Sequence, residues 1–408
     1  MFVSSAVYRA VLTLIVCSLP PTLWAGDWPQ FRGPGSNSVS SDAQPPANWG
    51  EGENIAWKVD LPGRGPSSPI VVGNRVIVTC SSGVNQDRLH VLCFDTANGK
   101  QLWERQFWAT GRTLSHPSSA NAAPTPASDG TSIFAFFSSN DLICLDLDGN
   151  LKWLRGLSYD FPKAGNDVGM SSSPLVIGDT VVAQVECQGD SFVTGVNKQT
   201  GEPLWRVERP REASWASPVA VRGGKPGEDL VLVQSTTKLS AHDPATGREV
   251  WAYEGACDAI SSALVADGVV YVPSKGTTAI RPGSTAAPEV VWNESRLQPG
   301  AASMLLSNGR LHMVNRAGVL TSAAASDGAI VGRVRLEGAF WGTPVLAGNR
   351  LYAINQDGAG QVVELREDGQ AKIIGKGKLE GPIQASPAIS AGALYVRSDK
   401  HLWKIAER

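Results

Sequence analysis

The chain has 408 residues, of which 42% are apolar and 18% are charged, and its formal net charge is −2. This composition excludes a disordered or collagen-like chain, and the lack of a basic excess argues against a general nucleic-acid binder. The 43 glycines and 13 tryptophans favour many short strands joined by turns.

Residues 1–25 have the layout of a secretory signal peptide. Arg9 supplies a positive charge, residues 10–19 are apolar, and Ala25 is a small residue at the predicted cleavage site. A lipoprotein signal at Cys17 is the alternative, although the bulky Val16 precedes it. We therefore expect a periplasmic or secreted protein. No later run approaches the ~20 apolar residues of a membrane-spanning helix.

The rest of the chain is predicted to hold a short lead-in, residues 26–49, and one repeat domain, residues 50–408. Asn54 to Val59 reads as an isolated strand with a tryptophan. Five cysteines remain after cleavage, an odd number, and we expect buried small apolar residues rather than a disulfide framework.

A repeat unit then recurs along the chain. Each unit opens with a short motif ahead of an apolar strand and continues through further short strands separated by turns. The openings lie about 40 to 55 residues apart, which is the period of four-stranded propeller blades. They begin at Ser68, Ala123, Ser173, Ser217, Ser262, Ser303, Thr343 and Ser386.

The last unit lacks a fourth strand, and the isolated strand before the first unit can supply it. Closure of this kind removes the exposed first and last edges of the ring. The sequence therefore predicts an all-β, eight-bladed β-propeller closed by an N-terminal strand. Seven blades, with one weak repeat misread, is the alternative.

Four units share an Asp or Asn, a Gly and a Trp at nearly constant spacing. The Gly suits a turn that other residues resist, the Asp or Asn caps that turn, and the Trp offers a flat face for packing between blades. These predicted structural residues are Asp95, Gly99, Trp103, Asp146, Gly149, Trp153, Asn197, Gly201, Trp205, Asp243, Gly247 and Trp251.

The run from Asp95 to Trp103 resembles the tryptophan-docking motif of the quinoprotein propeller family. That family contains pyrroloquinoline-quinone (PQQ) dehydrogenases and also non-enzymatic propellers, among them the lipoprotein subunit, BamB, of the outer-membrane β-barrel assembly machinery. The run from Asp27 to Pro34 is similar to the start of exported propellers common in planctomycete bacteria. The resemblance implies a PQQ-like β-propeller.

The resemblance does not carry catalytic residues to this sequence. PQQ dehydrogenases commonly have adjacent cysteines and bind calcium near a catalytic Asp, whereas this chain has no Cys-Cys pair. Asp167, Asp258 and Glu186 are acidic, but no spacing singles them out. We predict no catalytic residue, metal or cofactor; PQQ with calcium is the alternative. The histidines at positions 90, 312 and 401 fall in or beside predicted strands and suit structural roles.

Two functions follow, from different classes. The first is a non-catalytic scaffold that binds another protein or a cell-envelope macromolecule, and the alternative is a PQQ-dependent oxidoreductase acting on alcohols or sugars. Binding should use the face from which the inner strands start, since Trp215 and Trp341 lie outside the docking motif and suit a binding hot spot. The alternative is that the two tryptophans fill the mouth of the channel and have a structural role. The candidates are Arg64, His116, Asp167, Trp215, Asp258, Trp341 and Gln384.

Overall fold

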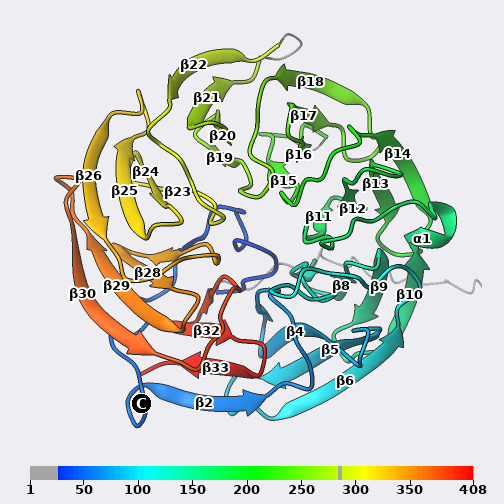
Figure 1. The fold of residues 1–408 in the computed structure, drawn as a ribbon, viewed down its shortest axis with the longest axis horizontal. Helices are drawn as coiled ribbons and strands as arrows, with labels where there is room; N and C mark the ends of the chain where they lie inside the picture. The colour runs from blue at the N-terminus through cyan, green and yellow to red at the C-terminus, as the bar shows by residue number, and fades with distance from the viewer. Residues whose placement is uncertain (1–25, 226, 284–286, 408) are drawn as a thin grey trace, which may run out of the picture.

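The protein is a ring of eight β-sheets around a central axis (Figure 1). The computed structural model describes residues 26–225, 227–283 and 287–407. The predicted signal peptide, residues 1–25, lies outside these described residues. Seven sheets have four strands, and one has a fifth, short strand at its inner edge. The prediction of eight blades is confirmed, and the seven-blade alternative is wrong.

The strands of each blade follow from the inner edge outward. Blade 1 contains β3 (Ile70–Val72), β4 (Arg75–Ser82), β5 (Arg88–Asp95) and β6 (Gln101–Trp108); blade 2 contains β7 (Ala127–Ser128), β8 (Ser132–Phe136), β9 (Asp141–Asp146) and β10 (Leu151–Gly156). Blade 3 contains β11 (Leu175–Ile177), β12 (Thr180–Val185), β13 (Phe192–Asn197) and β14 (Pro203–Glu208); blade 4 contains β15 (Val219–Val221), β16 (Leu230–Gln234), β17 (Lys238–His242) and β18 (Glu249–Glu254).

The second half of the ring repeats this order. Blade 5 contains β19 (Leu264–Ala266), β20 (Val269–Pro273), β21 (Thr277–Arg281) and β22 (Glu289–Glu294); blade 6 contains β23 (Leu305–Ser307), β24 (Arg310–Val314), β25 (Val319–Ala324) and β26 (Ile330–Arg335). Blade 7 contains β27 (Val345–Ala347), β28 (Arg350–Ile354), β29 (Ala359–Leu365) and β30 (Ala371–Lys378), with β1 (Val39–Ser40) beside β27; blade 8 contains β31 (Ala388–Ser390), β32 (Ala393–Arg397) and β33 (His401–Ile405).

The burial of each strand follows its place in the blade. Inner and middle strands, such as β3 and β8, are buried along their whole length, so their sequences are continuous apolar runs. The outer strand β14 has one buried side chain, Trp205, among exposed neighbours. A short helix, α1 (Leu157–Asp160), lies between blades 2 and 3.

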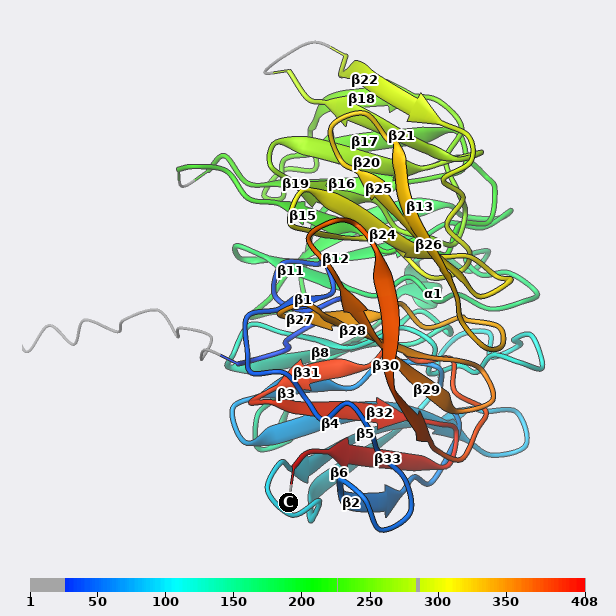
Figure 2. The same ribbon diagram turned by 90° about the vertical axis from the view of Figure 1, so that its left-hand side faces the viewer.

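The ring closes between the two ends of the chain. Strand β2 (Ile55–Asp60) pairs antiparallel with β33, with Ile55 opposite Ile405 and Asp60 opposite His401. Figure 2 shows the two strands side by side at the edge of the ring. The N-terminal strand therefore completes blade 8, as the sequence predicted, and leaves it with four strands.

Tryptophans join consecutive blades. The Trp103 indole packs on Gly149 of the next blade and donates from Nε1 to the Leu147 carbonyl at 2.9 Å. Trp153 makes the same contacts with Gly201 and Lys198. Each of these glycines has a positive φ, +82° at Gly149, so the turn exposes a flat backbone surface that an indole can cover.

One predicted position differs in the structure. The second unit opens at Thr125, not at Ala123, because Thr125 holds the place of the other opening hydroxyls around the axis. Cys80 lies opposite His90 in the β4–β5 hairpin, so it does not face Cys93. The five cysteines of the described residues are buried and unpaired, as expected of small apolar residues.

Residues 26–45 cross the face of the ring that carries the hairpin turns between inner and second strands, here called the hairpin face. Asp27 accepts a hydrogen bond from the Gly73 amide, and Asp42 accepts one from the Ala391 amide. Trp28 is 1% exposed. This N-terminal segment crosses the centre of the ring in Figure 1 and closes the hairpin end of the channel.

Candidate functional site

A cavity of about 530 Å³ lies on the propeller axis and opens at the face opposite the hairpin face. We call this the lead-in face, because the loops that lead into the inner strands lie there. Phe31 of the N-terminal segment lines the cavity from the hairpin side. Val168, Met170 and Ile260 give it apolar walls. Large, partly apolar cavities of this kind are the usual places where proteins bind ligands.

Eight hydroxyl groups encircle the axis and line this cavity. Each oxygen accepts a hydrogen bond, of 2.8 to 3.1 Å, from the backbone N–H of the equivalent residue in the preceding blade, and the last bond returns from blade 8 to blade 1. We call it the hydroxyl ring; it consists of Ser68, Thr125, Ser173, Ser217, Ser262, Ser303, Thr343 and Ser386.

The hydroxyl ring explains why the opening motif recurs in the sequence. All eight residues are buried, and they lie where the inner strands converge on the axis. Serine and threonine also satisfy an otherwise unpaired backbone N–H of the neighbouring blade. Seven of these residues are recognisable in the sequence as markers of the repeat, but no sequence pattern identifies them as cavity lining.

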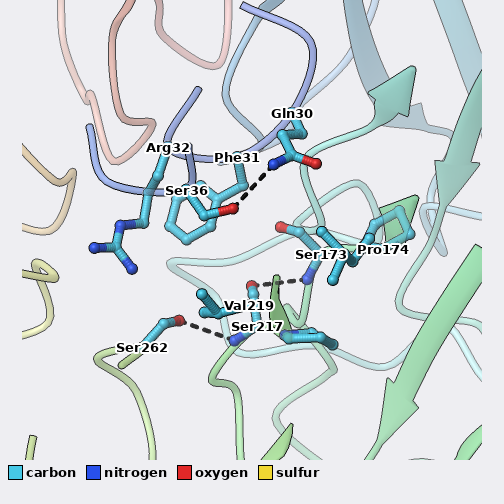
Figure 3. Close-up of a pocket in the computed structure, with 11 residues that line it drawn as sticks. Gln30, Phe31, Arg32, Ser36, Ser173, Pro174, Ser217, Val219 and Ser262 are labelled. Atoms are coloured by element: carbon cyan, nitrogen blue, oxygen red, sulfur yellow. Dashed lines mark hydrogen bonds between the residues drawn. The ribbon is translucent and has the colours of Figure 1, made fainter. Parts of the chain in front are cut away.

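The hairpin end of the channel is filled by residues 28–36, which we call the axial plug. Phe31 and Arg32 of the plug line a small void together with Ser173, Ser217 and Ser262 of the hydroxyl ring (Figure 3). Gln30 Nε2 donates to Ser36 Oγ at 2.9 Å within the plug. The described residues thus shape the central cavity into a cup that opens toward the lead-in face.

Four of the predicted binding-face residues line the cup: His116, Trp215, Trp341 and Gln384. Trp341 is 39% exposed, and its Nε1 donates to Gln356 Oε1 at 3.2 Å. Trp215 is more enclosed and donates from Nε1 to the Gly169 carbonyl at 2.8 Å, so it also connects two lead-in loops.

The other three predicted residues do not line the cup. Arg64 pairs with Asp399 at 2.9 Å in a smaller adjoining pocket, which Gln384 also lines. Asp167 is exposed and pairs with Arg112 at 2.6 Å. The Asp258 carboxylate accepts the backbone N–H groups of Ile260 and Ser261, which fixes the loop that carries Ile260 to the cup.

The lining of the cup is hydroxyl and apolar rather than charged. Among the described residues, its wall contains no Asp, Glu, Lys or Arg side chain. Glu186 lies outside the cup and is buried against Arg209 at 2.8 Å, and burial raises the pKa of its carboxyl to about 7. The cup therefore offers hydrogen-bond donors and apolar surface for non-covalent binding.

This donor set does not fit PQQ with calcium. Calcium takes six to eight oxygen ligands, with carboxylates prominent among them, and PQQ is itself a polycarboxylate that calls for cationic partners. Neither kind of side chain lines the cup. Within the part of the chain that the structure describes, no three His, Cys, Asp or Glu side chains gather where they could hold a metal ion.

The sequence matches one protein family over most of its length. Residues 49–190, 189–310 and 284–372 match the model described as outer membrane protein assembly factor BamB. The chain is 27% identical over 310 residues to the protein of that name from Burkholderia pseudomallei (strain K96243). The match covers 74% of this chain and 64% of the relative, so it spans less than two thirds of that relative's length.

Solved structures share the fold. BamB from Moraxella catarrhalis matches with a TM-score of 0.63 and 15% identity, covering 87% of this chain and 97% of that one. A europium-containing methanol dehydrogenase matches with a TM-score of 0.67 and 15% identity, covering 92% of this chain and 90% of that one. The quinohemoprotein alcohol dehydrogenase from Comamonas testosteroni matches with a TM-score of 0.66 and 12% identity, covering 94% of this chain and 81% of that one. At these identities the likeness shows the fold alone.

Proposed function

Because the chain belongs to the family of the outer membrane protein assembly factor BamB, we propose that it is a non-catalytic scaffold of the cell envelope that binds another protein through its lead-in face. The observation that carries this proposal is the open cup with Trp215 and Trp341 at its rim. Tryptophan is enriched at the energetic centres of protein interfaces, because it buries a large apolar surface at low entropic cost.

Trp341 is the better anchor of the two. Its indole is partly exposed, and the Arg316 guanidinium lies over the ring at 5.5 Å from the centroid. A partner side chain that enters the cup would cover this indole and contact the hydroxyl ring beneath it. Trp215 supports the loop geometry through its bond to the Gly169 carbonyl and contributes a smaller exposed surface.

Export is part of the same proposal. It rests on the signal-peptide layout of residues 1–25 and on the similarity of residues 27–34 to exported propellers. No helix among the described residues is both long and apolar enough to cross a membrane. N-terminal sequencing of protein from an envelope fraction should return Gly26 first; an intact Met1 or a lipid on Cys17 would contradict this.

The binding proposal is tested by placing a photo-crosslinking amino acid at position 341 and, as a matched control, at position 108. Trp108 is 63% exposed at the end of the outer strand β6, away from the cup. In cell envelopes of the native host, a discrete protein adduct is expected from position 341 only. The Trp341→Ala protein should lose capture of that same partner while the Trp108→Ala protein retains it.

Melting curves separate binding from folding. Trp341→Ala should leave the midpoint of thermal unfolding nearly unchanged, whereas Trp215→Ala should lower it because the bond between two lead-in loops is lost. If Trp341→Ala also melts much earlier, the indole is a structural plug of the channel mouth and the proposed anchor is wrong.

A further inference from the structure

Arg32 is a buried cation, and no carboxylate of the described residues forms an ion pair with it. It is 2% exposed, and its two Nη atoms donate to the carbonyls of Ala263 at 2.8 Å and Met304 at 2.7 Å. Its Nε has no hydrogen-bond partner among the described residues. Burial lowers the pKa of the guanidinium to about 9, so Arg32 still carries its charge at neutral pH. A buried charge is costly unless an opposite charge or hydrogen bonds offset it.

The hydroxyl ring adds donors on the same axis. A hydroxyl group has one proton to donate, and each ring oxygen already accepts a backbone N–H. Within the described part of the chain, none of the eight ring hydroxyls donates to a protein acceptor. Their protons are therefore free to point into the channel. The two carbonyls that hold Arg32 directly follow the ring residues Ser262 and Ser303.

A small void lies between these groups. It has a volume of about 10 Å³, which leaves room for a single small species. Arg32, Ser173, Ser217 and Ser262 line it, with Gln30 and Ser36 on the plug side (Figure 3). The rest of the lining is apolar and consists of Phe31, Pro174, Leu175, Pro218 and Val219. No Asp or Glu is among the described residues that line the void.

We propose that the void is a binding site for one small monovalent anion of chloride size, held by Arg32 and the hydroxyl protons of the ring. The anion would supply the missing counter-charge and accept the unused hydrogen bonds, and so fix the axial plug to blades 3 to 6. The void borders the plug, so the anion would stabilise the packing of the plug at the hairpin end of the channel. This site does not depend on the proposed binding of a protein at the lead-in face.

The test uses bromide, a chloride substitute whose anomalous X-ray scattering identifies it. Crystals of the wild-type protein grown in sodium bromide should show an anomalous peak on the axis beside Ser262 and Arg32. The peak should vanish in Arg32→Gln and persist in Arg32→Lys, which keeps the charge. Arg112→Gln is the control, because Arg112 is exposed and paired with Asp167.

A solution measurement accompanies the crystals. A ligand that binds only the folded state raises the melting midpoint as its concentration rises. Wild-type protein should therefore melt at a higher temperature in sodium bromide or chloride than in sodium gluconate, whose anion is too large for the void, at equal ionic strength. Arg32→Gln should lose this difference, and Arg112→Gln should keep it.

The outcomes separate cleanly. An axial water without anomalous signal in the wild type, or a bromide peak that persists in Arg32→Gln, would overturn the proposal. Equal midpoints in bromide and gluconate for the wild type would do the same. If Arg32→Gln fails to fold, the wild-type anomalous map decides alone: a peak beside Ser262 supports the site, and its absence refutes it.

Discussion

The histidines in strands have structural surroundings. His90 bonds to Ser82 at 2.7 Å and to Glu104 at 2.7 Å, inside blade 1. His312 lies in β24, is 3% exposed and bonds to the Ser322 hydroxyl at 2.9 Å. Burial lowers the pKa of His312 to about 4, with the nearby Arg310 charge adding to the effect. The neutral form of this imidazole is therefore part of the folded core.

His312 should make the protein less stable in acid. The unfolded chain binds a proton at this histidine near pH 6.5, whereas the folded chain does so only near pH 4. Between these values the unfolded state holds more protons, so the free energy of unfolding falls as pH falls, by at most about 1.4 kcal/mol per pH unit. Urea denaturation of His312→Gln should show a smaller loss between pH 7 and pH 5 than the wild type.

Ser322→Ala is the matched control for that comparison. It removes the hydrogen-bond partner but leaves the buried imidazole in place. The free energy of unfolding should therefore be lower at every pH, while its dependence on pH stays that of the wild type. An identical slope in His312→Gln and the wild type would mean that other groups, such as the buried His242, dominate the acid sensitivity.

At the scale of the strands and turns, one motif sets how neighbouring blades pack. Asp146 accepts the backbone N–H groups of Asp148 and Asn150 at 2.9 and 2.8 Å, which shapes the turn. Gly149 then adopts its positive φ, and the Trp103 indole lies against it. Asp95 and Gly99 form the same arrangement, with Trp57 of the closing strand as the indole.

Gly149→Ala should destabilise the fold strongly. A Cβ at this position would lie 2.6 Å from the Trp103 ring, and the left-handed backbone disfavours any side chain. Overpacking costs about 1–3 kcal/mol and a left-handed residue about 1–2 kcal/mol. Gly178→Ala is the control, since Gly178 has φ +58° but open space around it. Chemical denaturation should give a clearly larger loss for Gly149→Ala; equal losses would show that the indole contact adds nothing.

The molecule as a whole depends on a closed circle of contacts. The hydroxyl ring is continuous from blade 1 through blade 8 and back, with Ser386 N–H donating to Ser68 Oγ at 3.1 Å. On the outside, β2 pairs with β33, and the Trp57 indole donates to the Thr96 carbonyl of blade 1 at 3.1 Å. One short strand therefore joins the last blade to the first.

Deletion of residues 50–60 should lower the melting midpoint of the whole protein. It removes the outer strand of blade 8, exposes the edge of β33 and takes away the docking indole of blade 1. A synthetic peptide of residues 50–60, added in excess, should restore part of the loss by mass action. Differential scanning calorimetry measures both effects. An unchanged midpoint after the deletion would refute the idea that this strand holds the ring closed.

The sequence by itself determined the architecture. Eight openings and the recurrent docking motif predicted eight blades, and the strand at residues 54–59 predicted the closure, because each signal is local and repeats with the blade. The prediction that the second unit opens at Ala123 was wrong because the local pattern of the opening occurs twice in this stretch. Both residues precede a proline, so only the contact with Ser173 across the axis distinguishes them.

Tertiary structure alone decided what lies on the axis. Arg32 meets acceptors 231 and 272 residues further along the chain, and no local pattern reports such a contact. The same holds for the cup, where residues from all eight blades meet. The sequence shows that Trp215 and Trp341 lie outside the docking motif. It does not show that they line the cup while Arg64 and Asp258 do not. Repeats specify the ring, whereas the site arises where the ring's dissimilar loops and the N-terminal segment converge on its axis.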